Sequence, residues 1–216
     1  GQSIVPRRGR SAATPFVGRE DELARLFKSY EACVTEKRAR VVSVAGPPGI
    51  GKTRLGREFV SELIAGRVGP APRVIRANCL AYGRARALGT VADILSDMLR
   101  IPKGASSFDI AQQLEDFRLI HDEKGLLASL IAGEPFPEDI AAHRARDILY
   151  LAMTELMFKV CQRDPCVILL EDLQWSDSES VAWFAHLLSR FASRPLLVLV
   201  LARPGFFREH RDAFPM

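Results

Sequence analysis

Residues 46–53 read Gly46-Pro47-Pro48-Gly49-Ile50-Gly51-Lys52-Thr53. This stretch fits the pattern G-x-x-x-x-G-K-[ST], which is typical of a loop that holds the phosphates of a nucleotide. Its glycines permit backbone angles that turn consecutive N–H groups inward around an anion. A glycine–proline turn followed by a surface lysine is the alternative, and the flanking segments decide between the two.

The segments on both sides of the loop have the patterns of a strand and a helix. Residues 41–45 form a short apolar run, which predicts a buried strand. After the loop, apolar residues recur with helical spacing at Leu55, Phe59, Leu63 and Ile64. Phosphate is favoured at a helix N-terminus. Lys52 is therefore expected to reach the β and γ phosphates, and the Thr53 hydroxyl to bind Mg²⁺.

An acidic pair at the end of another apolar run supplies the second half of a nucleotide site. Residues 166–170 are apolar throughout, and Glu171 and Asp172 follow them. Ligands of open α/β sheets bind at the carboxyl ends of the strands, where these two carboxylates are expected. We assign Mg²⁺ to Thr53, Glu171 and Asp172, and the orientation of the attacking water to Asp172.

A cation follows the next predicted strand. Residues 196–202 are apolar, and Arg203 comes directly after them. An arginine in this position could sense or stabilise the charge of the γ-phosphate, or it could be an ordinary strand-end arginine. The candidate catalytic residues are therefore Asp172, Lys52 and Arg203.

The rest of the sequence alternates predicted strands and helices. Residues 74–77 predict a further strand, and residues 78–165 carry three helical stripes, which predicts a largely helical insertion before the acidic strand. Ser176 and Glu179 predict a capping box for the helix after the acidic pair. The fold class is therefore α/β, a P-loop NTPase whose parallel sheet is covered by helices on both faces.

Composition limits the function classes. Lysine and arginine number 30 against 26 aspartates and glutamates, and the resulting charge of +4 is too small to indicate a nucleic-acid-binding protein. No apolar run approaches the roughly 20 residues that a membrane span needs. The four cysteines lack C-x-x-C spacing, which argues against a zinc site. The sequence predicts a soluble, cytoplasmic protein that binds neither membrane nor nucleic acid.

The N-terminal segment and one missing motif give two further expectations. Residues 1–15 have no periodicity and are expected to be a flexible linker or an expression remnant, so that the P-loop domain covers residues 16–216. The only asparagine of the chain is Asn78, which excludes the N-K-x-D motif that reads guanine. The bound nucleotide is therefore expected to carry adenine as its base.

Four stretches of the sequence form a recognisable set: Phe16-Val17-Gly18-Arg19-Glu20, Gly46 to Thr53, Cys79-Leu80-Ala81-Tyr82-Gly83 and Leu170-Glu171-Asp172-Leu173-Gln174-Trp175-Ser176-Asp177. Together these motifs resemble the AAA-type ATPase module of STAND proteins, which are multidomain signal-transduction ATPases. This variety is often found beside adenylate cyclase, protein-kinase or transcription-regulator domains. The resemblance runs from about Thr14 to Arg203.

The resemblance implies roles for individual residues. It places Val17, Gly18 and Arg19 beside the adenine and gives Arg203 a sensor role. Gly18 as a helix N-cap and Trp175 as a core residue are the alternative readings. The expected nucleotide-binding residues are Val17, Gly18, Arg19, Gly46, Pro48, Gly49, Gly51, Lys52, Thr53 and Arg54.

The chain departs from the family pattern in ways that predict weak catalysis. The acidic pair is Glu171 then Asp172, whereas P-loop ATPases usually carry aspartate then glutamate, and Asp172 is one methylene shorter than the usual glutamate. Neither a lid or winged-helix region nor a fifth strand is expected after Arg203. The chain is therefore expected to be a piece of a longer protein.

We predict an ATP-binding and slowly ATP-hydrolysing domain that acts as a nucleotide switch in a larger signalling protein. Its ligands are ATP or ADP with Mg²⁺. Its expected partners are the effector domains of the same protein and, in an oligomer that depends on nucleotide, further copies of the chain. Two alternatives are a nucleotide-gated scaffold without turnover and a DNA-handling AAA module of the initiator kind.

Overall fold

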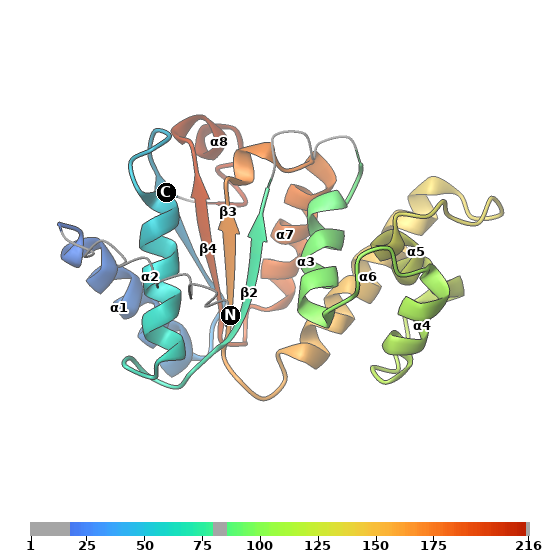
Figure 1. The fold of residues 1–216 in the computed structure, drawn as a ribbon, viewed down its shortest axis with the longest axis horizontal. Helices are drawn as coiled ribbons and strands as arrows, with labels where there is room; N and C mark the ends of the chain where they lie inside the picture. Colours follow the sequence, from blue (N-terminus) through green and yellow to red (C-terminus); the bar gives the residue numbers. More distant parts are fainter. Residues whose placement is uncertain (1–17, 80–85, 215–216) are drawn as a thin grey trace, which may run out of the picture.

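The centre of the molecule is a parallel sheet, seen in a computed structural model that describes residues 18–79 and 86–214 (Figure 1). Its strands are β1 (Arg40–Ala45), β2 (Arg73–Asn78), β3 (Cys166–Glu171) and β4 (Leu196–Ala202). All pairings are parallel, and the order across the sheet is β1-β4-β3-β2. The predicted linker, residues 1–15, lies outside the described residues.

The two central strands explain why the sheet needs cover on both faces. Every residue of β3 and β4 is buried. Alternate side chains of these strands enter two separate cores, with Val167 and Leu169 on one face and Ile168 and Leu170 on the other. Since successive strand residues point to opposite faces, an uninterrupted apolar strand requires helices on both sides. The predicted α/β class with a doubly covered parallel sheet is confirmed.

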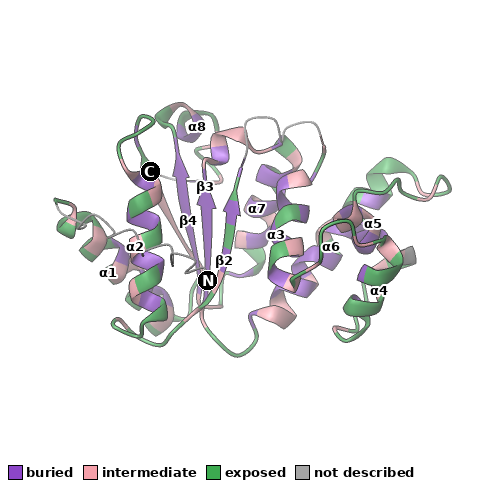
Figure 2. Ribbon diagram, viewed as in Figure 1, coloured by how far each residue is buried: buried purple, intermediate pink, exposed green. Residues whose placement is uncertain are grey.

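Helices cover the two faces in separate groups (Figures 1 and 2). One face carries α1 (Glu20–Glu36) and α2 (Lys52–Ile64). The other carries α3 (Gly89–Leu99), α6 (Ala142–Val160) and α7 (Ser178–Arg190). The remaining elements are α4 (Ser107–Glu115), the 3₁₀ turn η2 (Glu123–Gly125), α5 (Leu126–Ala132), the 3₁₀ turn η3 (Leu173–Trp175) and α8 (Pro204–Glu209).

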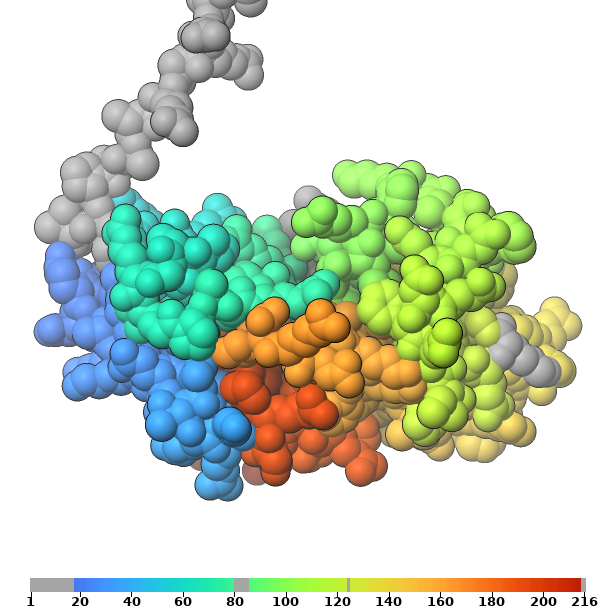
Figure 3. Space-filling view, turned by 90° about the horizontal axis from the view of Figure 1, so that it is seen from below, coloured from blue at the N-terminus to red at the C-terminus, as the bar shows by residue number. Residues whose placement is uncertain are grey.

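The segment between β2 and β3 contains four α-helices among its described residues: α3, α4, α5 and α6. Three of them follow the apolar stripes of the sequence, whereas α4 was not predicted because it buries only Ile110 and Leu114. Seen from below, this segment and α1 lie at opposite ends of the molecule (Figure 3). None of the helices among the described residues is long and apolar enough to cross a membrane.

Helix α2 packs closely on the sheet at Gly56. A Cβ atom at this position would lie 3.0 Å from methyl carbons of both Leu169 and Leu201. Such a contact is tighter than close-packed interiors tolerate without a shift. Gly56 therefore brings α2, and the loop that precedes it, close to the carboxyl ends of β3 and β4.

The start of α7 differs from the prediction. Asp177, and not Ser176, is the N-cap residue, and its carboxylate accepts a hydrogen bond from the Ser180 N–H at 2.8 Å. The same carboxylate accepts the N–H groups of Leu88 at 2.9 Å and Thr90 at 3.2 Å. The predicted capping box of Ser176 and Glu179 is therefore wrong, because the Asp177 carboxylate satisfies donors of two helices at once.

Replacing Asp177 with alanine should lower the free energy of unfolding by about 3 kcal/mol. The variant loses a helix cap and leaves buried N–H groups of α3 and α7 without an acceptor. Urea unfolding followed by circular dichroism measures the change. Ser106→Ala, which removes the exposed cap of α4, is the matched control and should cost only about 1 kcal/mol. Equal losses in the two variants would contradict this role of Asp177.

Candidate functional site

The loop between β1 and α2 has the backbone geometry that its glycines predict. Gly49 and Gly51 have φ angles of 80° and 91°, in the left-handed region that glycine adopts readily. Gly51 is the N-cap residue of α2, which begins at Lys52. The N-terminus of α2 therefore opens on this loop, an arrangement that favours an anion.

Lys52 folds back onto the loop. Its Nζ atom donates hydrogen bonds to the carbonyl oxygens of Gly46 at 2.9 Å and Pro47 at 3.0 Å. Only 7% of the residue is exposed. The ammonium group is thus held within the loop by two neutral acceptors, and a phosphate oxygen would be a charged acceptor with a stronger hydrogen bond.

The strand order brings the separate motifs together at one edge of the sheet. Because β4 lies between β1 and β3, Arg203 follows the strand that separates the phosphate loop from the acidic pair. A cleft of about 710 Å³ opens at this edge. It is lined by Pro48, Gly49, Gly51, Lys52, Thr53, Arg54, Arg57, Glu58, Ser61, Asp172, Trp175 and Arg203.

Asp172 directly follows β3 and Arg203 directly follows β4, and the side chain of Gln174 links the two. This role of Gln174 was not predicted from the sequence. The Gln174 amide nitrogen donates to the Asp172 carboxylate at 2.9 Å, and the Gln174 carbonyl oxygen accepts the Arg203 N–H at 3.1 Å. Asp172 itself has a φ of 54°, in the left-handed region that aspartate tolerates better than most residues. Gln174 thereby fixes the ends of β3 and β4 relative to each other.

The Arg203 side chain lies on an aromatic ring. Its guanidinium carbon is 5.2 Å from the centre of the Trp175 ring, within the range of a cation–π contact. Trp175 is half-buried in η3 and lines the cleft. It therefore contacts Arg203 and also packs, partly buried, against the hydrophobic core.

Glu171 is paired with an arginine of α2 that was not among the predicted site residues. Arg57 donates from Nε to one Glu171 oxygen and from Nη2 to the other, both at 3.0 Å. The hydrogen bonds and charge of Glu171 raise the pKa of Arg57 above its usual value. The sequence signal was the spacing, because Arg57 stands four residues after Thr53 and so on the same face of α2.

The predicted site residues are not all in the cleft. Gly46 and Glu171 are buried next to it without lining it. Arg19 donates a hydrogen bond to the Ile50 carbonyl oxygen of the phosphate loop. The Gly18 N–H donates to the Glu20 carboxylate at 3.0 Å, and the N-cap of α1 is Arg19. Val17 lies outside the described residues.

The charges and donor atoms of the cleft suit a phosphate bound with Mg²⁺. Four basic side chains line it against two acidic ones. Of the candidate metal ligands, the Thr53 hydroxyl and the Asp172 carboxylate line the cleft, and the Glu171 carboxylate lies next to it. Mg²⁺ prefers such oxygen donors, usually one or two carboxylates beside phosphate oxygens. The described residues contain no cluster of three or more histidine, cysteine or acidic side chains that would hold a metal alone.

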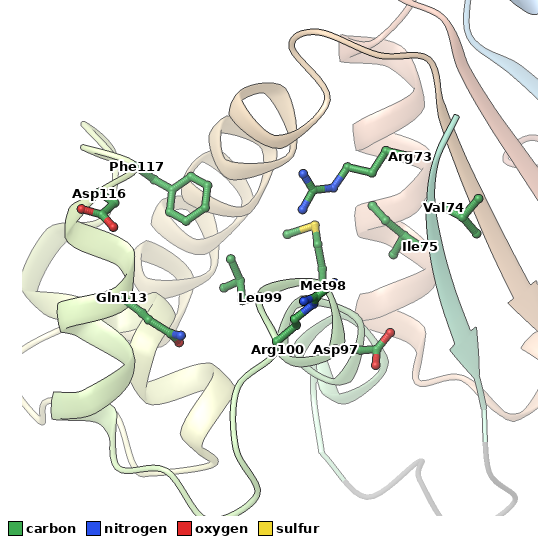
Figure 4. Close-up of a pocket in the computed structure, with 10 residues that line it drawn as sticks. All are labelled: Arg73, Val74, Ile75, Asp97, Met98, Leu99, Arg100, Gln113, Asp116 and Phe117. Carbon is green, nitrogen blue, oxygen red and sulfur yellow. The ribbon is translucent and has the colours of Figure 1, made fainter. Parts of the chain in front are cut away.

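A second cleft, of about 760 Å³, lies between β2 and the helices α3 and α4 (Figure 4). Arg73 points from β2 into this cleft, toward Met98 and Phe117. None of the predicted site residues lines it. It has no glycine-rich loop or helix N-terminus to hold a phosphate, so we place the functional site at the carboxyl edge of the sheet.

A parallel α/β sheet with a phosphate loop at its carboxyl edge defines a P-loop nucleotide-binding protein. The family model described as AAA ATPase domain matches residues 15–200, and the chain belongs to this family. The AAA part of the resemblance drawn from the motifs is thereby confirmed.

A curated relative extends the comparison. The chain is 26% identical over 208 residues to an uncharacterized protein of Rhizobium meliloti (strain 1021). The match covers 92% of this chain and 19% of the relative. The chain therefore spans about a fifth of the length of that relative.

Proposed function

We propose that this chain binds ATP with Mg²⁺, hydrolyses it slowly, and acts as a nucleotide switch within a longer protein of the STAND type. The observation that carries the proposal is that one and the same cleft is lined by Lys52, Thr53, Asp172 and Arg203. These four side chains come from α2 and from the ends of two neighbouring strands. Phosphoryl transfer depends mainly on positioning and on charge stabilisation, which such an arrangement supplies.

Each side chain has a proposed task. Lys52 exchanges the carbonyl oxygens of Gly46 and Pro47 for phosphate oxygens. Thr53, Glu171 and Asp172 are the residues that hold Mg²⁺, which neutralises phosphate charge when bound. Asp172 also orients the attacking water, and Gln174 holds the Asp172 carboxylate in place. Arg203 senses the γ-phosphate.

Signalling follows from the position of Arg203. Its backbone N–H is held by Gln174 and its guanidinium rests on Trp175, so a change of charge in the cleft reaches both η3 and the start of α8. In this proposal residues 16–216 form the ATPase domain, and effector domains of the same protein read the change. The match to this chain covers about one fifth of the curated relative, which supports the proposal that the domain works inside a longer chain.

ATP should displace a fluorescent ADP analogue from the domain at a concentration at least tenfold below that of GTP. The expectation rests on the absence of the guanine-reading N-K-x-D motif, since Asn78 is the only asparagine of the chain. A competition titration followed by fluorescence anisotropy measures both midpoints. Equal midpoints would show that the base is not read, and failure of the analogue to bind would overturn the proposed function itself.

A further inference from the structure

The Glu171 carboxylate has a partner at both of its oxygens. Arg57 binds Oε1 through Nε and Oε2 through Nη2, each at 3.0 Å. The Glu171 side chain is only 7% exposed. A buried carboxylate needs a cation or several hydrogen bonds to offset its loss of water, and Arg57 supplies both.

The two partners differ in their freedom to move. The Arg57 side chain is 60% exposed and stands on the surface of α2. Glu171 is the last residue of a fully buried strand. Breaking the pair would therefore return the arginine to water, whereas the carboxylate would remain buried and need another cation.

Arg57 also stands beside the candidate metal ligands. It lies one helical turn after Thr53 and lines the cleft together with Thr53 and Asp172. A cation bound by Thr53 and Glu171 would meet the guanidinium that holds Glu171. One buried carboxylate thus has two candidate cations, one from the protein and one from solution.

We propose that Arg57 competes with Mg²⁺ for Glu171 and thereby sets the Mg²⁺ concentration at which the domain binds nucleotide. The inference rests on the proposed function, because it assigns Glu171 to the metal. Without nucleotide, Arg57 neutralises Glu171 and keeps its carboxylate in place. When Mg²⁺ and nucleotide bind together, the guanidinium leaves Glu171 and turns toward solvent. Arg57 is a positioning residue that acts through Glu171.

The competition predicts the sign of a mutational effect. If Arg57 must be displaced, Arg57→Gln removes the competing cation and the domain should need less Mg²⁺. If Arg57 instead holds Glu171 ready for the metal, the same variant should need more Mg²⁺. A purely structural ion pair would change stability and leave the Mg²⁺ requirement unchanged.

The test is a titration of Mg²⁺ at a fixed concentration of a fluorescent ADP analogue, followed by anisotropy. For Arg57→Gln the half-saturating Mg²⁺ concentration should fall by about tenfold. A hydrogen bond to a charged group contributes more net free energy than a neutral one, and the difference corresponds to roughly this factor in an equilibrium constant. Arg57→Lys keeps the charge but loses the two-point contact. Its half-saturating Mg²⁺ concentration should lie between that of Arg57→Gln and that of the parent. Arg57→Lys also serves as the second variant if Arg57→Gln does not fold.

A control variant and a double variant are titrated with Mg²⁺ in the same way. Arg67→Gln removes an arginine whose Nη1 binds Glu62 at 2.8 Å outside the cleft, and its Mg²⁺ midpoint should equal that of the parent. In a Glu171→Gln background, Arg57→Gln should no longer lower the midpoint.

The outcomes separate the two proposals. An unchanged or higher Mg²⁺ midpoint in Arg57→Gln would overturn the competition while the analogue still binds. If the parent bound the analogue at no Mg²⁺ concentration, the proposed function itself would fail.

Discussion

Replacing Lys52 with alanine should abolish the stabilisation that ATP gives to the domain. At a concentration one hundred times its dissociation constant, a ligand of the folded state adds about 2.7 kcal/mol to the free energy of unfolding. Lys52 is the loop cation, and its ammonium group already lies among the loop carbonyls with only 7% of the residue exposed. The variant keeps the loop glycines but loses the charge that we expect to contact the phosphates.

The measurement is the shift of the melting temperature with and without ATP and Mg²⁺. The shift is the relevant quantity, because losing the bonds to Gly46 and Pro47 also changes the stability of the nucleotide-free domain. Lys28→Ala, on the exposed surface of α1, is the control and should keep the full shift of the parent. A parent that shows no ATP-dependent shift would contradict the proposed function, and a full shift in Lys52→Ala would contradict the role of the lysine.

Asp172→Asn should spare ATP binding and reduce hydrolysis by at least about a hundredfold, the usual contribution of a general base. The amide can still accept the hydrogen bond from Gln174, so the geometry of η3 is kept, but it cannot accept a proton from water. We expect the parent itself to turn over well below about 1 s⁻¹, the low end of typical enzyme rates. Asp172 is shorter than a glutamate, and the cleft is open to solvent.

Phosphate release under single-turnover conditions measures this difference, with nucleotide affinity determined in parallel. Asp147→Asn, an exposed aspartate of α6, repeats the chemical change away from the cleft and should match the parent. Brisk turnover by the parent would show that the reversed acidic pair does not weaken catalysis. A variant as active as the parent would show that Asp172 is not the base.

The sequence predicted the sheet well because its strands are apolar runs. Residues 196–202 coincide with β4, and the runs at 41–45 and 166–170 fall within one residue of β1 and β3. Both faces of β3 and β4 are buried, so side-chain character alone marks them. The α4 helix was missed for the opposite reason, since its exposed residues outnumber its two buried ones. The prediction of a buried strand at 41–45 is correct in its position but wrong in its burial, because β1 lies at the edge of the described sheet and its residues are only partly buried or exposed.

The candidate site was predictable only where a local motif marked it. The phosphate loop, Asp172 and Arg203 adjoin recognisable strands, and the structure brings them to one cleft. Arg57 was missed because its partner Glu171 is 114 residues away, and no local pattern reports such a pair. Gln174 belongs to the motif at residues 170–177, but its contacts with Asp172 and Arg203 depend on the position of β4 beside β3.

The central place of β4 has a consequence for biosynthesis. Within the described part of the chain, β1 pairs with β4 alone, although β1 is the first of these four strands to be synthesised and β4 is the last of the four. The Gly46 N–H, at the start of the phosphate loop, donates to the Ala202 carbonyl oxygen at 3.3 Å. Such distant pairings form slowly, because closing the long intervening loop costs conformational entropy before the strand contacts repay it. A nascent chain therefore cannot complete the edge of the sheet at which the candidate site lies until β4 is released, and until then β1 is an unpaired strand, which makes it prone to aggregate.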